Sequence, residues 1–163
     1  MLFRGDVMKP TWKRYALWIG LTEAVGAVSA LLSRNGMKLY ESAVVQPPLA
    51  PPMWVFPVVW TILYALMGVS AARISARPVS ALTACGQKFF FTQLIFNFFW
   101  SIIYFNLQAY WAAFWWLLIL WCLVLAMIFC YSEEDRTAAW LQLPYFAWLT
   151  FAGYLNFWVA RNN

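Results

Sequence analysis

Long runs of apolar residues separated by short polar breaks dominate the chain. No Asp, Glu, Lys or Arg occurs in Phe89–Ser132, Ser42–Ala72 or Thr137–Ala160, and Tyr15–Ser33 contains only Glu23. A membrane-spanning helix needs about 20 predominantly apolar residues. The run Phe89–Ser132 is about twice that length, so it must fold back on itself. The polar triplet Asn106-Leu107-Gln108 is the expected reversal.

This pattern predicts an all-α fold, an integral membrane bundle of five transmembrane helices in one domain covering residues 1–163. The expected helices are about residues 15–33, 54–75, 81–105, 109–131 and 137–160. We expect the first helix to end at Arg34-Asn35-Gly36, because glycine commonly terminates helices. Pro57 is tolerated in a first turn, whereas Pro144 is expected to kink the last helix. Transmembrane barrel strands would alternate in polarity over short segments, and the continuous runs exclude that architecture.

The segment between the first two helices is rich in proline. It contains Pro47, Pro48, Pro51 and Pro52. Proline lacks an amide hydrogen and fixes φ, so this segment cannot form regular helix. We expect an extended loop that lies against one mouth of the bundle.

Composition supports a membrane location. The chain is 64% hydrophobic and 10% charged, whereas soluble domains lie near one half and one quarter. A soluble domain of 163 residues has too much surface to hide that apolar excess, which must face lipid. The first hydrophobic segment lacks a small-residue cleavage site after it, so we expect a retained helix and not a signal peptide.

The basic residues give the bundle an orientation. The formal net charge is +5, but the basic residues cluster at helix ends and form no patch that would favour nucleic acid. One side carries Arg4, Lys9, Lys13, Arg14, Arg73, Arg77, Lys88 and Arg136, and the other carries Arg34, Lys38 and Arg161. By the positive-inside rule, we expect a multi-pass protein of a bacterial cell membrane with its N-terminus in the cytoplasm.

Conventional catalytic and metal chemistry has little support. The chain contains no histidine, the commonest general base and a frequent metal ligand. Neither a phosphate-binding glycine loop nor a nucleophile elbow occurs. Cys85, Cys122 and Cys130 lack the paired spacing of a metal site and are interpreted as reduced packing residues. We therefore expect no metal and no required cofactor.

Aromatic and amide side chains share helical faces at several positions. These faces contain Trp60 and Tyr64; Gln93, Asn97, Trp100 and Tyr104; and Tyr145, Trp148, Ala152, Leu155 and Asn156. Amides inside a bilayer are costly unless paired, so they should face the bundle interior. Two interpretations remain open: interhelical hydrogen bonding alone, or a cavity in which flat aromatic ligands stack and amides orient them. Glu23, an acid within a span, is a further functional candidate.

Three motifs resemble one known family. The segment Pro51-Pro52-Met53-Trp54-Val55 continues through Trp60 and Leu63-Tyr64 to Met67-Gly68. It resembles the Pro-Pro-x-Trp-Val signature of the TspO/translocator protein family, which includes tryptophan-rich sensory proteins and peripheral benzodiazepine receptors. Gln93-Leu94 with Asn97 and Trp100, and Leu143–Ala152 with Leu155-Asn156, resemble its third and fifth helices. The resemblance covers about residues 15–161 in the same order.

The resemblance implies a five-helix membrane bundle, often dimeric, that binds porphyrins, haem, sterols and benzodiazepine-type drugs. The family pocket lies between helices, under the loop joining the first two. The resemblance and the shared helical faces together give the expected ligand-binding residues. These are Trp60, Tyr64, Gln93, Asn97, Trp100, Tyr145, Trp148, Ala152 and Leu155. Trp60 and Trp148 match two tryptophans implicated in light- and oxygen-dependent porphyrin breakdown in some bacterial members.

The loop departs from the family pattern. The family has Trp-Tyr and then Lys-Pro-x-Trp-x-Pro-Pro, where this chain has Leu39-Tyr40 and Gln46–Pro52. Two tryptophans and a lysine are therefore missing, and ligand preference is expected to differ. Phe157 replaces the tyrosine of the animal sterol motif, so specific cholesterol recognition is not expected.

The leading hypothesis is a membrane receptor or sensor for porphyrin, haem or a similar flat hydrophobic ligand, with Arg34 and Lys38 available to porphyrin carboxylates. Photo-oxidative porphyrin degradation through Trp60 and Trp148 is the first alternative. Transport of tetrapyrroles or sterols is another, which the lack of an internal repeat disfavours. A structural scaffold is the remaining alternative.

Overall fold

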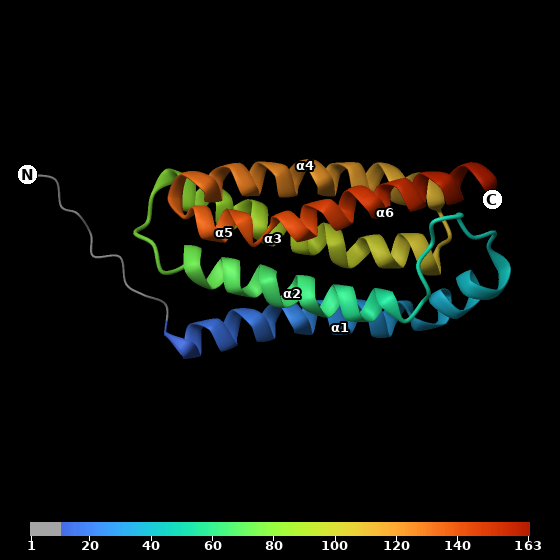
Figure 1. Ribbon diagram of the computed structural model, residues 1–163, viewed down its shortest axis with the longest axis horizontal. Coiled ribbons are helices and arrows are strands. Elements are labelled where there is room, and N and C mark those ends of the chain that lie inside the picture. The colour runs from blue at the N-terminus through green and yellow to red at the C-terminus, as the bar shows by residue number, and fades with distance from the viewer. Residues whose placement is uncertain (1–10) are drawn as a thin grey trace, which may run out of the picture.

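Helices arranged along one axis make up the fold. The structure is a computed structural model that describes residues 11–163 (Figure 1). Its elements are α1 (Trp12–Ala43), α2 (Val55–Ile74), α3 (Ala81–Ser101), the short π-helix η1 (Ile102–Asn106), α4 (Tyr110–Glu134), α5 (Arg136–Trp140) and α6 (Leu143–Asn162). No strand occurs within the described residues. The all-α prediction is confirmed.

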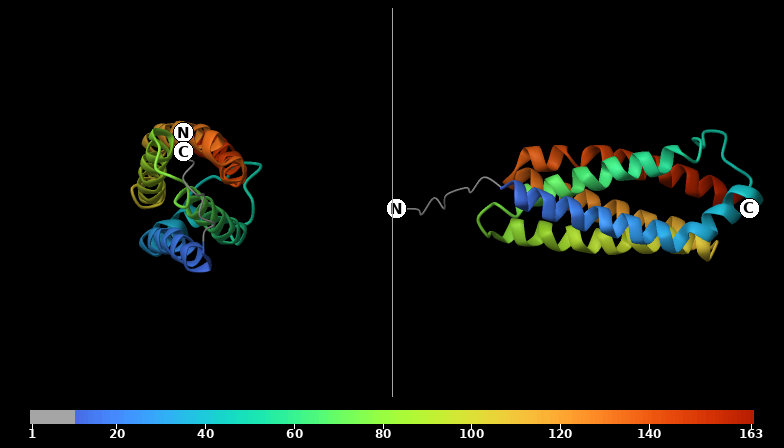
Figure 2. Two further views of the ribbon diagram at one scale, coloured as in Figure 1. Left: turned by 90° about the vertical axis from the view of Figure 1, so that its left-hand side faces the viewer. Right: turned by 90° about the horizontal axis from the view of Figure 1, so that it is seen from below.

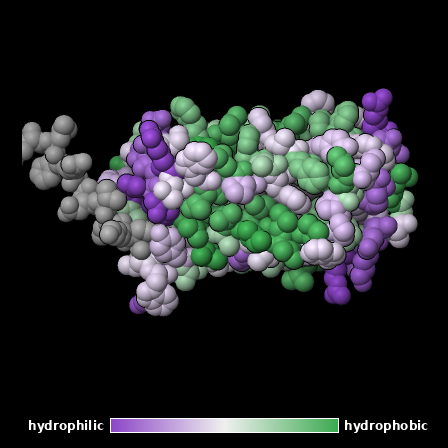
Figure 3. Space-filling view, viewed as in Figure 1, coloured by the Kyte–Doolittle hydropathy of each residue, from purple (hydrophilic) through white to green (hydrophobic). Residues whose placement is uncertain are grey.

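Four stretches in the described chain are long and apolar enough to cross a membrane. They are α1, α2, the combined α3 and η1, and α4. The fifth long helix, α6, has 20 residues and packs against α4. A broad apolar surface separates two hydrophilic ends on the face shown in Figure 3. The protein is therefore a multi-pass, all-helical membrane protein.

The first helix is longer than predicted. It continues past Arg34-Asn35-Gly36 to Ala43. Gly36 does not terminate it, because no glycine in the described chain has the positive φ that such a cap requires. A Cβ at Gly36 would instead lie 2.5 Å from the Phe105 carbonyl oxygen. This glycine allows α1 to pass close to η1, and the predicted end at residue 33 is wrong.

The last predicted helix is divided into two. Residues 137–160 were expected to form one kinked helix, but α5 ends at Trp140 and α6 begins at Leu143. Pro144 lies in the first turn of α6, where its missing amide hydrogen leaves no helical bond unmade. The proline begins a new helix and does not kink a continuous one.

The other boundaries agree with the sequence pattern. The long apolar run reverses at residues 107–109, and Gln108 has a φ of 51°. The loop between α1 and α2 carries the prolines and lies at the end of the bundle opposite α5 (Figure 2). The Val45 amide donates to Asn163 Oδ1 at 2.9 Å, which ties this loop to the C-terminal end of α6.

A charged cluster closes the end that contains α5. Asp135 accepts from the amides of Thr137 and Ala138 and so caps α5. Its carboxylate also pairs with Arg73 at 2.9 Å and with Arg77 at 2.8 Å. Burial raises the pKa of Asp135, but hydrogen bonds from the two arginines outweigh it and hold the pKa below its ordinary value. Arg4 and Lys9, assigned to this side, lie outside the described residues.

Small residues bring α1 and α2 together within one chain. A Cβ at Gly68 would lie 2.5 Å from Ile19 Cα, so only glycine permits this helix approach. The Thr22 hydroxyl donates to the Tyr64 carbonyl oxygen across the same contact at 2.8 Å. This contact fixes the position of Tyr64 on α2.

Candidate ligand cavity

A cavity of about 360 Å³ lies in the half of the bundle nearest the α1–α2 loop. Small-molecule sites commonly enclose about 300–1,000 Å³. The walls come from α1, the loop, α2, α3 with η1, and α6. They consist of Gly26, Ser29, Ala30, Met37, Tyr40, Met53, Phe56, Pro57, Trp60, Tyr64, Asn97, Trp100, Ser101, Tyr104, Phe105, Trp148, Ala152, Leu155 and Asn156.

Aromatic rings form much of this wall. Trp60 lies 5.6 Å from Tyr64 between ring centroids, one helical turn away on α2. On α3 and η1, Trp100 stacks on Tyr104 at 5.0 Å with an interplanar angle of 20°. Trp148 on α6 meets Phe56 edge to face at 5.9 Å. Rings from three helices therefore offer stacking and edge contacts to a flat guest.

Asn97 connects the cavity to a buried hydrogen-bond network. Its Nδ2 donates to the Tyr145 hydroxyl at 2.8 Å, and its Oδ1 accepts from the Tyr64 hydroxyl at 3.3 Å. The Tyr145 hydroxyl in turn donates to Gln93 Oε1 at 2.9 Å. Tyr145 and Gln93 are fully buried, and Asn97 is 2% exposed. The network links α2, α3 and α6 behind the cavity wall and pairs polar groups that would be costly alone.

A second set of polar contacts lies nearer η1. Trp100 Nε1 donates to Asn156 Oδ1 at 3.3 Å, and Asn156 Nδ2 donates to the Tyr110 carbonyl oxygen at 2.9 Å. The Tyr104 hydroxyl donates to the Tyr40 hydroxyl at 3.1 Å. These bonds hold the stacked Trp100 and Tyr104 rings against α1 and α6.

The cavity wall contains no charged side chain among the described residues. Arg34 and Lys38, which the sequence offered to porphyrin carboxylates, are exposed on α1 and do not line it. Glu23 is half-buried, also outside the lining, and forms no ion pair within residues 11–163. Stacking and dispersion therefore dominate what the cavity offers a guest.

Most predicted site residues meet at this cavity. The lining includes Trp60, Tyr64, Asn97, Trp100, Trp148, Ala152 and Leu155. Gln93 and Tyr145 do not line it and lie behind Asn97 in the hydrogen-bond network. Whether any of them contacts a ligand stays a prediction. The helical period explains the grouping, since residues three and four apart share a face.

Sequence reasoning missed the wall contributed by α1 and the η1 residue Phe105. Gly26, Ser29 and Met37 carry no distinctive chemistry, and the predicted end at residue 33 removed Met37 and Tyr40 from the helix. Phe105 comes from η1, where a π-helical turn changes the side-chain direction from that of an α-helix. The spacing of Gly26, Ser29, Ala30, Met37 and Tyr40 was the available signal, because it follows one helical face.

Comparison of the sequence with known proteins identifies a family. The TspO/MBR family model matches residues 18–161. The chain is 32% identical to the tryptophan-rich protein TspO of Chlorobaculum tepidum over 149 residues, covering 91% of this chain and 94% of that protein. It is 34% identical to protein CrtK of Rhodobacter capsulatus over 150 residues, covering 91% and 92%. It is 32% identical to the tryptophan-rich sensory protein of Cereibacter sphaeroides over 158 residues, covering 96% and 95%. Because the family model covers most of the chain and these relatives share about a third of its residues, this chain belongs to the TspO/MBR family.

Proposed function

We propose that the protein is a membrane receptor that binds a porphyrin, haem or a similarly flat hydrophobic molecule in the cavity. The supporting observation is the aromatic wall, in which Trp60, Trp100 and Trp148 come from three different helices. Such rings stack on a flat apolar disc from several sides. A similar protein is named a tryptophan-rich sensory protein, which is compatible with a receptor role.

The uncharged wall suggests how a porphyrin lies. Its apolar disc enters between the helices, and its carboxylates stay at the mouth, where water solvates them and no desolvation penalty arises. The dimethyl ester of protoporphyrin should then bind with nearly the same Kd as the free acid. If the ester bound much more weakly than the free acid, a cation such as Arg34 or Lys38 would have to lie at the carboxylates, and this pose would be contradicted.

The basic end of the bundle sets its direction in the membrane. Arg73, Arg77 and Arg136 lie at the α5 end, which the positive-inside rule assigns to the cytoplasm. The α1–α2 loop and the cavity then face the opposite side. This orientation can be tested by placing a single cysteine in the α1–α2 loop and treating intact cells with a membrane-impermeant thiol reagent. Labelling of that cysteine is the expected result, because the loop then faces the outside.

The direct test is titration of the purified protein with protoporphyrin, followed by its absorption shift. Trp148→Phe should weaken binding by about three- to tenfold, the value of one good aromatic pair. Ala152→Leu should block binding, because it adds bulk to the cavity wall. Trp140→Phe is the matched control, since Trp140 is 69% exposed at the other end. Equal binding by all three variants would refute the site.

Haem offers a separate test of the same site. The chain contains no histidine, so bound haem should lack the absorption spectrum of histidine ligation. A spectrum typical of histidine-ligated haem would contradict this picture of the site.

A second candidate function is photo-oxidative porphyrin breakdown. The observation that favours it is the presence of both Trp60 and Trp148 in one wall, where either indole can donate an electron to an excited guest and molecular oxygen is the final electron acceptor. Under light and oxygen, at porphyrin concentrations that saturate each variant, Trp60→Phe and Trp148→Phe should abolish turnover, whereas saturable dark binding persists. Unchanged degradation by both variants would refute this chemistry and leave the receptor function intact.

A further inference from the structure

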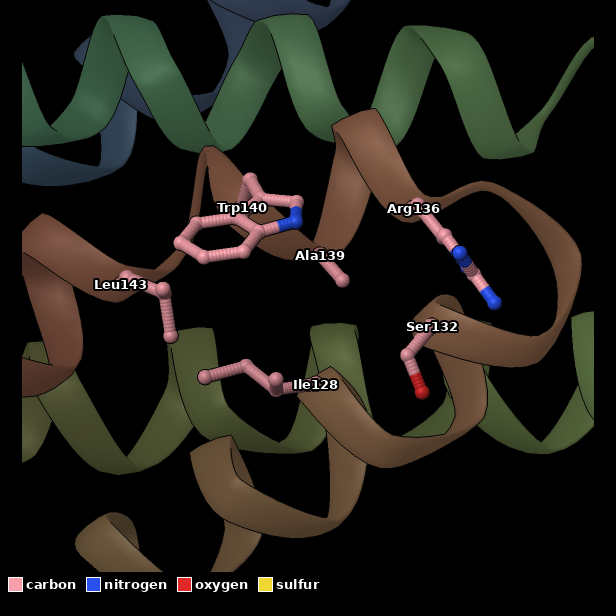
Figure 4. A pocket seen from close by; sticks show the side chains of 6 residues that line it. All are labelled: Ile128, Ser132, Arg136, Ala139, Trp140 and Leu143. Atoms are coloured by element: carbon pink, nitrogen blue, oxygen red, sulfur yellow. The ribbon is translucent and has the colours of Figure 1, made fainter.

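A second depression lies at the α5 end, away from the cavity. It is lined by Ile128, Ser132, Arg136, Ala139, Trp140 and Leu143 (Figure 4). None of these residues lines the cavity described above. The depression is therefore independent of the proposed receptor site, and we refer to it as the α4–α5 slot.

The two ends of the slot differ in polarity. Arg136 and Ser132 lie together at one end, and Trp140, Leu143 and Ile128 surround the other (Figure 4). Ser132 belongs to the last turn of α4, and Ile128 lies one turn deeper, about 6 Å along the helix. Leu143 begins α6, which returns into the bundle. The polar end thus lies at the rim of the membrane span, and the apolar end points toward the bilayer centre.

Arg136 differs from its neighbours in lacking a partner. Arg73 and Arg77 are paired with Asp135, whereas Arg136 is exposed and forms no ion pair within residues 11–163. A planar guanidinium matches phosphate oxygens with two parallel hydrogen bonds. The Ser132 hydroxyl donates to the Phe129 carbonyl oxygen at 2.7 Å, so its oxygen is left to accept a hydrogen bond from a guest.

Trp140 adds an independent indication of membrane contact. Its side chain is 69% exposed, and it borders the apolar end of the slot beside Leu143. Exposed tryptophan collects at headgroup depth, because its ring is apolar and its N–H is polar. Glu134 accepts from Ser80 and Asp135 faces the two arginines, so neither of these acids is paired with Arg136.

We propose that the α4–α5 slot binds an anionic phospholipid of the surrounding bilayer. The lipid phosphate lies on the Arg136 guanidinium, and a headgroup hydroxyl donates to Ser132. One acyl chain lies against Ile128 and Leu143. The charge of Arg136 selects an anionic headgroup, and the apolar end requires a chain as well as a phosphate.

Native mass spectrometry of the full-length protein in detergent tests this site. Phosphatidylglycerol and phosphatidylcholine with identical chains are added in separate titrations. Phosphatidylcholine carries the same phosphate, but its choline cation cancels the charge that Arg136 attracts and offers no hydroxyl to Ser132. One phosphatidylglycerol should therefore be retained about tenfold more tightly than phosphatidylcholine. Arg136→Gln should lower phosphatidylglycerol retention to the phosphatidylcholine level. Lys88→Gln removes an exposed cation of α3 and should leave the preference intact.

A second variant tests the apolar end without touching the charge. Leu143→Ala should weaken retention of long-chain phosphatidylglycerol severalfold and leave a dihexanoyl form unchanged. The proposal would be overturned if Arg136→Gln retained phosphatidylglycerol as well as the unsubstituted protein does. It would also be overturned if Lys88→Gln lost as much retention as Arg136→Gln, because that result would indicate diffuse charge attraction. Complete displacement of the lipid by millimolar inorganic phosphate would also overturn it, since the slot would then be a simple anion site.

Discussion

Replacing Gly68 by alanine is expected to separate α1 from α2 and to destabilise the bundle. The added Cβ would lie 2.5 Å from Ile19 Cα and 2.7 Å from Ile19 N. These are backbone atoms, so no side-chain rotation relieves the clash. Carbon atoms in contact sit about 3.5–4.0 Å apart, and the helices must therefore move apart by about 1 Å.

The movement has two energetic consequences. A radial gap of about 1 Å loses a quarter to a half of the dispersion energy of the affected contacts. The Thr22 hydroxyl bond to the Tyr64 carbonyl oxygen, now 2.8 Å long, would exceed hydrogen-bonding distance. Overpacking of this kind costs about 1–3 kcal/mol, and the lost bond adds about 1 kcal/mol. Alanine returns about 0.5–1 kcal/mol through its helix propensity, so the net loss is about 1–3.5 kcal/mol.

The assay is thermal unfolding in detergent, followed by circular dichroism. For a domain of this size a loss of 1 kcal/mol lowers Tm by about 2–4 °C, so Gly68→Ala should unfold about 2–14 °C earlier. Gly20→Ala is the matched control, because a Cβ at Gly20 on the same helix pair meets nothing within 4 Å. A Tm for Gly68→Ala equal to that of Gly20→Ala would refute the proposed close contact.

Three further substitutions test other parts of the bundle, each by thermal unfolding. Tyr145→Phe leaves Asn97 Nδ2 and Gln93 Oε1 unpaired and should cost about 1–3 kcal/mol; an unchanged Tm would contradict the network. Asp135→Asn should make the unfolding free energy depend less on pH in acid. The lowered pKa of the Asp135 carboxyl stabilises the fold above the unfolded-state pKa, and this stabilisation is lost as the pH falls through the folded-state pKa. Gln142→Met should raise stability, because the buried Gln142 amide has no hydrogen-bond partner in the described chain.

The helices were predictable where polarity alone determines their limits. The charge-free run from residue 89 to residue 132 exceeds one span, and its polar triplet marks the reversal that the structure contains at Gln108. The end of α1 was not predictable in this way. Gly36 allows a tertiary contact with η1. In the sequence, a glycine that permits close helix approach cannot be distinguished from one that ends a helix.

The cavity residues that were predictable are those with aromatic or amide side chains and their neighbours on the same helical face. Asn97 and Trp100 on one face, and Trp148, Ala152 and Leu155 on another, follow from the helical period. The α1 wall did not follow, because Gly26 and Ala30 contribute space and not a functional group. Which faces oppose each other depends on interhelical distances, and no single helix encodes them.

From sequence alone, interhelical pairing and a cavity are alternative explanations of the buried amides, but Asn97 combines them. One of its N–H groups and its carbonyl oxygen are already bonded to Tyr145 and Tyr64, although the side chain also lines the cavity. An amide held by two tyrosines is fixed in orientation, so at most one N–H and one lone pair remain for a guest. A guest therefore gains little from hydrogen bonds with this amide and much from the surrounding rings. Ligand selectivity in this protein should accordingly depend on flatness and size more than on the polar groups at the ligand's edge.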